Sequence, residues 1–137
     1  VTNRENLDRL VNLIDSPSNS LAICTGSLGA NLQNDIPAIV RHFGALDRLG
    51  FMHVRNIKVH EPWVFNEVAH SSKEGSLDFY AIMKALYDVH YNGPIRPYHG
   101  RMIWDEKGMP GYGLYDRALG ANYLLGLWEA IKRDHEK

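Results

Sequence analysis

The sequence has a single cysteine, Cys24, in 137 residues and lacks any long hydrophobic segment. One cysteine cannot form a disulfide within the chain, so we expect a reducing compartment in which the thiol is free for other chemistry. No apolar run approaches the roughly 20 residues of a membrane-spanning helix, and the polar start VTNRENLDR is unlike a signal peptide. The sequence therefore predicts a soluble protein with no membrane partner.

An excess of one charge sign is also absent, because 15 Lys and Arg residues stand against 16 Asp and Glu residues. Binding to a phosphate backbone needs a basic excess, so nucleic acid is not an expected partner. The glycines match neither a dinucleotide-binding fingerprint nor a P-loop, and heptads, repeats and low-complexity tracts are missing. The length suffices for one domain with a core but not for two, so residues 1–137 are expected to form a single unit.

Helical and strand patterns alternate along the chain. A capping box formed by Thr2 and Glu5 opens the first helix, and Asn34 or Asp35 caps the second. The expected order is a helix over residues 4–15, a strand over 21–25, a helix from about 35 to 49, a strand over 51–59, a long loop over 60–75, a helix from about 76 to 92, a short strand within 94–101 and a last helix over 115–134. This α-βα-βα-βα order is typical of an α/β fold in which right-handed crossovers join parallel strands.

Chemically capable side chains follow the predicted strands. Cys24 ends the first strand, His53 and Arg55 lie on one face of the second, and Arg96 and the RPYHGR segment belong to the third. Since α/β enzymes place their chemistry beyond the carboxyl ends of parallel strands, these residues could converge at one rim of the sheet.

A thiolate and a neutral imidazole on adjacent strand ends can share a divalent transition metal. Taken alone, Cys24 also fits a small buried apolar residue, and His53 a hydrogen-bonded core residue. Their equivalent positions on neighbouring strands favour the metal interpretation.

Other polar residues fit substrate chemistry. His99 could act as an acid or base near neutral pH, although a surface-loop histidine would have the same sequence context. Forked hydrogen bonds to a substrate carboxylate are possible for Arg55, Arg96 and Arg101, each of which also fits an ordinary salt bridge.

Several segments together resemble the C-terminal part of the mannonate dehydratase family: ICTGSLGA with NDIP, HVRN, EVAHSSKEGSLD, RPYHGRMIWDEKGMPGYGLYDRALGA and YLLGLWEAI. The resemblance implies a (β/α)8 TIM barrel, a Mn²⁺ ion (or Fe²⁺ or another divalent metal), and removal of water from D-mannonate to give 2-keto-3-deoxy-D-gluconate in cytoplasmic hexuronate catabolism. It also implies that Cys24 and His53 ligate the metal and that His99 and Tyr112 transfer protons, with Tyr112 favoured as base and His99 as acid.

The chain departs from this family in two ways. A (β/α)8 barrel needs roughly 200 residues or more, and about 250 is typical. Three βα units are therefore expected to be a C-terminal portion that associates with the rest of the barrel or with other copies. Tyr98 stands where the family has a metal-binding aspartate, so as a ligand it is expected to bind the ion more weakly. The alternatives are a segment that serves only in packing and a metal-dependent sugar isomerase on the same barrel.

Overall fold

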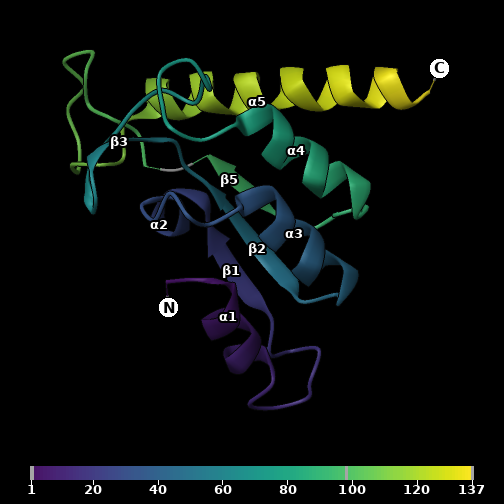
Figure 1. The fold of residues 1–137 in the computed structure, drawn as a ribbon. Helices are drawn as coiled ribbons and strands as arrows, with labels where there is room; N and C mark the ends of the chain where they lie inside the picture. Colours follow the sequence, from purple (N-terminus) through teal and green to yellow (C-terminus); the bar gives the residue numbers. More distant parts are fainter. Residues whose placement is uncertain (1, 98, 137) are drawn as a thin grey trace.

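The computed structural model describes residues 2–97 and 99–136 and contains a mixed α/β arrangement (Figure 1). The elements in chain order are α1 (Arg4–Val11), β1 (Leu21–Cys24), α2 (Thr25–Gly29), α3 (Ile36–Ala45), β2 (Leu49–Val54), β3 (Ile57–Glu61), β4 (Val64–Glu67), α4 (Phe79–Asp88), β5 (Ile95–Pro97) and α5 (Leu114–His135). None of the helices in this described part of the chain is long and apolar enough to cross a membrane.

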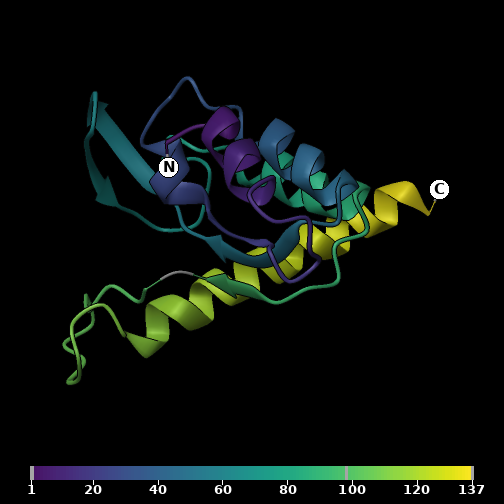
Figure 2. The same ribbon diagram turned by 90° about the horizontal axis from the view of Figure 1, so that it is seen from below.

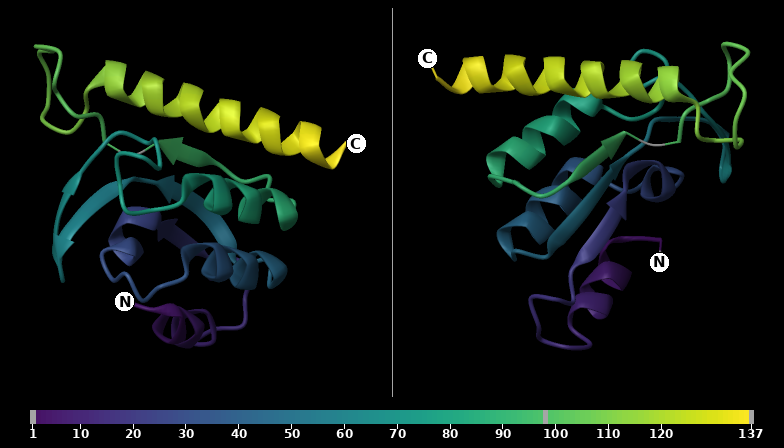
Figure 3. Two further views of the ribbon diagram at one scale, coloured as in Figure 1. Left: turned by 45° about the horizontal axis from the view of Figure 1, so that its top comes forward. Right: turned by 180° about the vertical axis from the view of Figure 1, so that it is seen from behind.

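Strands β1, β2 and β5 form a three-stranded sheet in that order, and both pairings are parallel. Helices α1, α3 and α4 lie on one face of this sheet, and α5 runs along the β5 side (Figures 2 and 3). Helix α4 packs between α3 and α5, and α5 also contacts β5. The expected parallel βα succession is therefore confirmed for these three strands.

The two faces of the sheet differ in burial. The face under the helices is sealed by Ile23, Met52 and Val54, which are at most 1% exposed. Successive residues of a strand point to opposite faces, so Cys24 and His53 lie on the other face, where both are only partly buried. The sheet therefore presents its polar side chains on the face that the helices leave uncovered.

Side-chain caps fix the starts of the helices. Asp35 Oδ1 accepts a hydrogen bond from the Ala38 amide at 2.9 Å, and Asp78 Oδ1 accepts one from the Ala81 amide at 3.0 Å. The first helix is capped by Asn3 rather than Thr2 and ends at Val11, four residues before the expected end at Asp15. Helix α4 starts at Phe79 rather than near Ser76, because the cap is Asp78.

Two expected loops contain regular structure. Thr25, expected at the end of the first strand, and residues 26–29, expected as a loop of small residues, form the short helix α2 (Thr25–Gly29), whose residues are mostly buried. The expected single strand over 51–59 is interrupted at Arg55 and Asn56, and β3 then pairs with β4 as an antiparallel hairpin inside what was expected to be strand end and loop.

Asn56 explains the interruption. Its side-chain Nδ2 donates to the carbonyl oxygens of Ala69 and Ser71, both at 2.9 Å, and the residue is 1% exposed. His70 is also buried and donates from Nε2 to the Val54 carbonyl oxygen at 3.0 Å. These contacts fasten the segment after the hairpin to the carboxyl end of β2.

Candidate active site

The first group of candidate residues forms a row across the carboxyl ends of the strands. Cys24 of β1 is the register partner of His53 in β2, and His53 is in turn the partner of Arg96 in β5. Register partners in a parallel sheet point to the same face, so the three side chains share the open face of the sheet. The expected convergence at one rim is therefore present for these residues.

Aromatic contacts extend this row into the loop before α5. The rings of His53 and His99 have centroids 5.9 Å apart, and those of His99 and Tyr112 are 6.2 Å apart. His99 and Tyr112, expected to share proton transfer, are thus side by side although twelve residues separate them.

Backbone hydrogen bonds among Gly100, Gly111 and Gly113, called here the glycine neck, bring His99 and Tyr112 together. Gly100 donates its amide to the Gly111 carbonyl at 2.9 Å, and Gly113 donates to the Gly100 carbonyl at 3.0 Å, which makes an isolated parallel bridge between Gly100 and Tyr112. A Cβ on Gly100 would lie 1.6 Å from the Gly113 carbonyl oxygen, so this approach requires glycine.

The histidines of the row are held in their neutral form. Burial, together with the positive charges of Arg96 and Arg55 and the neighbouring His99, lowers the pKa of His53 from 6.5 to about 4. Burial and the charges of Arg55, Arg96 and Arg117 also lower the pKa of His99. A neutral imidazole has the lone pair that a metal or a proton requires.

Arg55 is fixed by partners on both the backbone and the side chain. The Thr25 hydroxyl donates to the Arg55 carbonyl at 2.7 Å and accepts from the Arg55 amide at 2.8 Å. The Arg55 guanidinium lies 3.4 Å from a Glu67 carboxylate oxygen and 5.6 Å from the centre of the Phe65 ring. Hence α2 and the β3–β4 hairpin both help to set the position of this arginine.

Arg101 is committed to Asp116 in the first turn of α5. Its Nε and Nη2 donate to the two Asp116 carboxylate oxygens, and its backbone amide also donates to one of them, all at 2.9 Å. Asp116 is 5% exposed. Burial raises the pKa of Asp116, but the hydrogen bonds from Arg101 outweigh it and hold that pKa below its ordinary value.

The sequence interpretation missed three charged residues here: Glu67, Asp116 and Arg117. Arg117 lies in α5 with its guanidinium 4.8 Å from the centre of the Tyr112 ring. Burial raises the pKa of Glu67 to about 7 despite the opposing charge of Arg55. Asp116 and Arg117 belong to the motif GYGLYDRALGA, so an arginine and an aspartate in the first turn of the last helix were an available signal. No sequence signal pointed to Glu67, because its segment was expected to be a loop.

The donor types at the strand ends suit a divalent metal. Cys24 is a free thiol, and His53 is a neutral imidazole on the adjacent strand. In residues 2–97 and 99–136, no group of three or more His, Cys, Asp or Glu side chains could hold an ion. Tyr98, the third expected ligand, lies outside the described residues.

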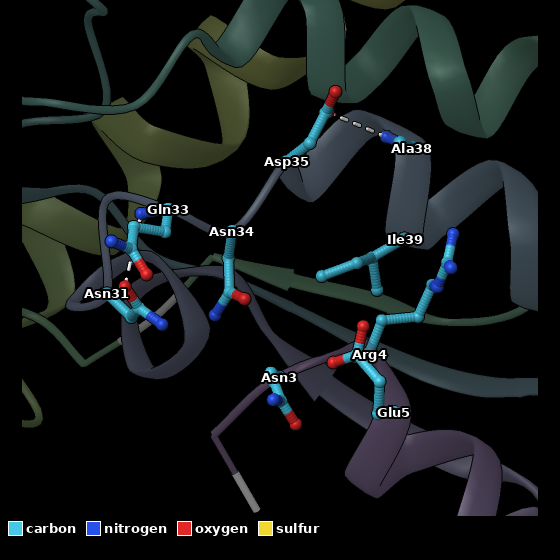
Figure 4. A pocket seen from close by; sticks show the side chains of 9 residues that line it. All are labelled: Asn3, Arg4, Glu5, Asn31, Gln33, Asn34, Asp35, Ala38 and Ile39. Atoms are coloured by element: carbon cyan, nitrogen blue, oxygen red, sulfur yellow. Dashed lines mark hydrogen bonds between the residues drawn. The ribbon is translucent and has the colours of Figure 1, made fainter.

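A cavity of about 320 Å³ lies elsewhere, between the start of α1 and the connection from α2 to α3 (Figure 4). Its lining is polar and includes Asn3, Glu5, Asn31 and Asn34. None of the candidate residues at the strand ends lines it, so we assign it no part in the site.

Comparisons with known proteins cover the whole chain. The family model described as D-mannonate dehydratase (UxuA) matches residues 1–137. A mannonate dehydratase 2 of Halalkalibacterium halodurans is 57% identical over 131 residues, which are 96% of this chain and 38% of that protein. A mannonate dehydratase of Thermotoga neapolitana is 55% identical over 137 residues, which are 100% of this chain and 38% of that protein.

The crystal structure of mannonate dehydratase from Streptococcus suis serotype 2 has a TM-score of 0.92 and 43% identity, covering 100% of this chain and 39% of that one. The chain thus spans about 38% of the length of the curated relatives it matches. The matches do not bear out the expected assignment to the C-terminal part of the enzyme. Because the family model extends over every residue and the relatives exceed half identity, the chain belongs to the D-mannonate dehydratase (UxuA) family.

Proposed function

We propose that this chain contributes to a metal-dependent hydro-lyase that removes water from D-mannonate to give 2-keto-3-deoxy-D-gluconate. The observation that carries the proposal is the match of the complete chain to proteins named mannonate dehydratase. The relatives reported above all bear that name, so neither a sugar isomerase nor a segment that serves only in packing is favoured.

The proposed architecture is a (β/α)8 barrel to which residues 1–137 contribute one unit with three parallel strands. The support is the sheet order β1-β2-β5, in which consecutive parallel strands are neighbours and the helices stay on one face. In a barrel the other face points inward, and this is the face that carries Cys24 and His53.

Cys24 and His53 would hold a divalent ion, proposed to be Mn²⁺ or Fe²⁺, and Tyr98 is the third proposed ligand. When bound, the ion supplies a Lewis acid for the substrate carboxylate and the neighbouring hydroxyl oxygen. The support is the chemistry of the two donors, since a free thiol and a neutral imidazole are good ligands for such ions.

His99 and Tyr112 would move the protons. In the proposed reaction Tyr112 takes the proton from C2, the C3 hydroxyl leaves as water with a proton from His99, and the resulting enol becomes the 2-keto acid. Burial and the charges of nearby arginines lower the pKa of His99, and an anionic substrate that offsets these charges would favour a proton on His99. The contact between the two rings supports their joint action.

Arg55, Arg96 and Arg101 are the proposed carboxylate-binding residues. Arg55 pairs with Glu67, and Arg101 pairs with Asp116. Of the three arginines, Arg96 therefore has the guanidinium that is most available to a substrate carboxylate. The substrate is therefore proposed to be a small sugar acid. The free thiol of Cys24 favours the reducing cytoplasm as its location.

The test is an assay with D-mannonate and Mn²⁺ that detects the 2-keto acid product. The chain is assayed alone and in a chimera in which it replaces the matching segment of the Thermotoga neapolitana relative. The chimera should form product, and His99→Ala in it should lower kcat by about 100-fold or more, as expected for loss of a general acid or base.

Two further outcomes decide the proposal. Tyr98→Asp in the chimera should reduce the Mn²⁺ concentration needed for half-maximal rate, since a carboxylate binds a divalent ion better than a phenol. A correctly folded chimera that forms no product both with Tyr98 and with Tyr98→Asp would contradict the dehydratase function. Formation of a sugar isomer instead would show the alternative reaction.

A further inference from the structure

Arg117 combines burial with unsatisfied hydrogen-bonding capacity. It lies in the first turns of α5, and its guanidinium carbon is 4.8 Å from the centre of the Tyr112 ring. The Nε and Nη2 atoms are buried, and no acceptor among the described residues reaches either of them. Buried donors of a permanent cation without an acceptor are costly, and native structures rarely keep them without a function.

The other arginines near the site differ in this respect. Arg101 forms three hydrogen bonds to Asp116, and Arg55 faces Glu67. Both therefore have a carboxylate within the chain. Arg117 Nε and Nη2 have no acceptor among the residues that the structure describes, so the guanidinium of Arg117, like that of Arg96, is available to an external anion.

Other positive charges lie near Arg117 and favour the binding of an anion there. An anion bound to Arg117 would lie beside the proposed proton-transfer residues. The charges of Arg55, Arg96 and Arg117 all act on His99, whose ring contacts both His53 and Tyr112. Arg117 lies over the Tyr112 ring, and its planar guanidinium is a group that a carboxylate can match with two hydrogen bonds.

We propose that Arg117 binds the carboxylate of the sugar acid and so determines the preference of this site for an acid over a neutral polyol. This inference rests on the proposed function, which it deepens by a specificity-determining residue outside the arginines expected from the sequence. Arg117 forms a charge-assisted fork to the substrate, whereas Arg101 keeps the loop in place through Asp116.

The test compares two ligands of the same stereochemistry, D-mannonate and its uncharged counterpart D-mannitol, by titration calorimetry with Mn²⁺ on this chain within the chimera described above. The unsubstituted chain should prefer D-mannonate. Arg117→Met should weaken D-mannonate binding by about 10- to 100-fold and leave D-mannitol binding unchanged, since one charge-assisted pair is lost. Arg117→Lys, which keeps the charge without the fork, should fall between the two.

Arg41→Met is the matched control, because Arg41 pairs with Asp88 at 2.9 Å on the helical face. It should bind both ligands as the unsubstituted chain does. Circular dichroism identifies any variant that fails to fold. If Arg117→Met does not fold, the ligand preference of Arg117→Lys decides whether the proposal holds.

Two results would overturn the proposal: an unsubstituted chain that binds both ligands equally, or Arg117 variants that keep the full preference for D-mannonate. Product formation is measured separately on the same proteins. Loss of the preference in Arg117→Met without any dehydration by the unsubstituted protein would reject the proposed function and leave the anion-binding role of Arg117 standing.

Discussion

Glu67 carries a carboxyl group whose ionisation is opposed by its surroundings. Burial raises its pKa from 4.5 to about 7, while the nearby Arg55 and Arg101 charges lower it only in part. Between these two pH values the folded chain binds more protons at this site than the unfolded chain does. The contribution of Glu67 to stability therefore falls as the pH rises from about 4.5 to about 7.

Glu67→Gln should remove this pH dependence, because the amide does not titrate. Urea unfolding at pH 5 and pH 8 should show that the unsubstituted chain loses stability relative to Glu67→Gln as the pH rises. Glu61→Gln, an exposed carboxylate of the same hairpin, serves as control and should leave the pH dependence in place. Parallel pH curves for Glu67→Gln and the unsubstituted chain would contradict this prediction.

Asp116 should contribute more to stability than a surface carboxylate. Asp116→Asn removes the charge that accepts three hydrogen bonds from Arg101, so unfolding free energy should fall by about 1–3 kcal/mol. Because Arg101 lowers the pKa of Asp116, this stabilisation is present above the ordinary pKa of an aspartate and is lost as the pH falls through the lowered value.

Chemical unfolding at neutral pH measures the effect. Arg41→Met, which breaks an exposed pair with Asp88, is the comparison and should change stability by less than about 1 kcal/mol. Equal effects of the two substitutions would show that the Arg101–Asp116 pair is no stronger than an ordinary surface pair.

The glycine neck of the loop between β5 and α5 is the segment most sensitive to an added methyl group. Gly100→Ala would place a Cβ against the Gly113 backbone, which cannot move as a side chain can, so the bridge to Tyr112 should open. We expect a loss of about 1–3 kcal/mol and faster proteolysis within residues 101–112.

Gly126→Ala is the matched control for that substitution. Gly126 lies in α5 with nothing within 4 Å of the added Cβ, so alanine should stabilise the helix by about 0.5–1 kcal/mol. Unchanged proteolysis in Gly100→Ala would show that the bridge is not needed to close the loop.

Elements with strong local signals could be predicted from the sequence, and those set by distant contacts could not. Asp35, one of the two expected caps, caps α3, since a capping aspartate acts on its own neighbours. Helix α2 depends instead on the buried Thr25 hydroxyl, whose partner Arg55 is thirty residues away. The end of β2 depends on Asn56, whose acceptors lie beyond the hairpin.

The candidate site shows the same division. Strand period and strand ends placed Cys24, His53 and Arg96 on one edge, and the register confirms that placement. The contacts of Arg101 with Asp116 and of Arg117 with Tyr112 depend on how α5 packs against the loop. A local sequence pattern does not predict such packing. Their roles in binding and catalysis remain predictions.

Association is the expected behaviour of the chain in isolation. The sheet has two edge strands, β1 and β5, and α5 exposes large apolar side chains, with Leu114 72% and Leu125 66% exposed. Unpaired strand edges and apolar patches of this kind favour contact with other copies or with further barrel strands.

Sedimentation velocity over a series of concentrations should therefore show species heavier than the 15.6 kDa monomer, with a fraction that grows with concentration. Leu125→Glu should reduce that fraction, whereas Leu13→Glu, at an exposed position near the other end of the chain, should not. A monomer at every concentration would show that these surfaces do not associate.

The backbone bridge between Gly100 and Tyr112 closes the base of a loop. The tip of this loop can therefore move without moving the His99 and Tyr112 rings at its base. Because this bridge joins the two ends of the loop, we expect the His99 and Tyr112 rings to stay close even when the residues between them change. A Cβ added at Gly108, near the tip, would meet only the end of the Met102 side chain within 4 Å, apart from its chain neighbours. A fluorescent label attached at Gly108, through a cysteine in a Cys24→Ser background, could thus report opening of the loop while the paired rings stay in register.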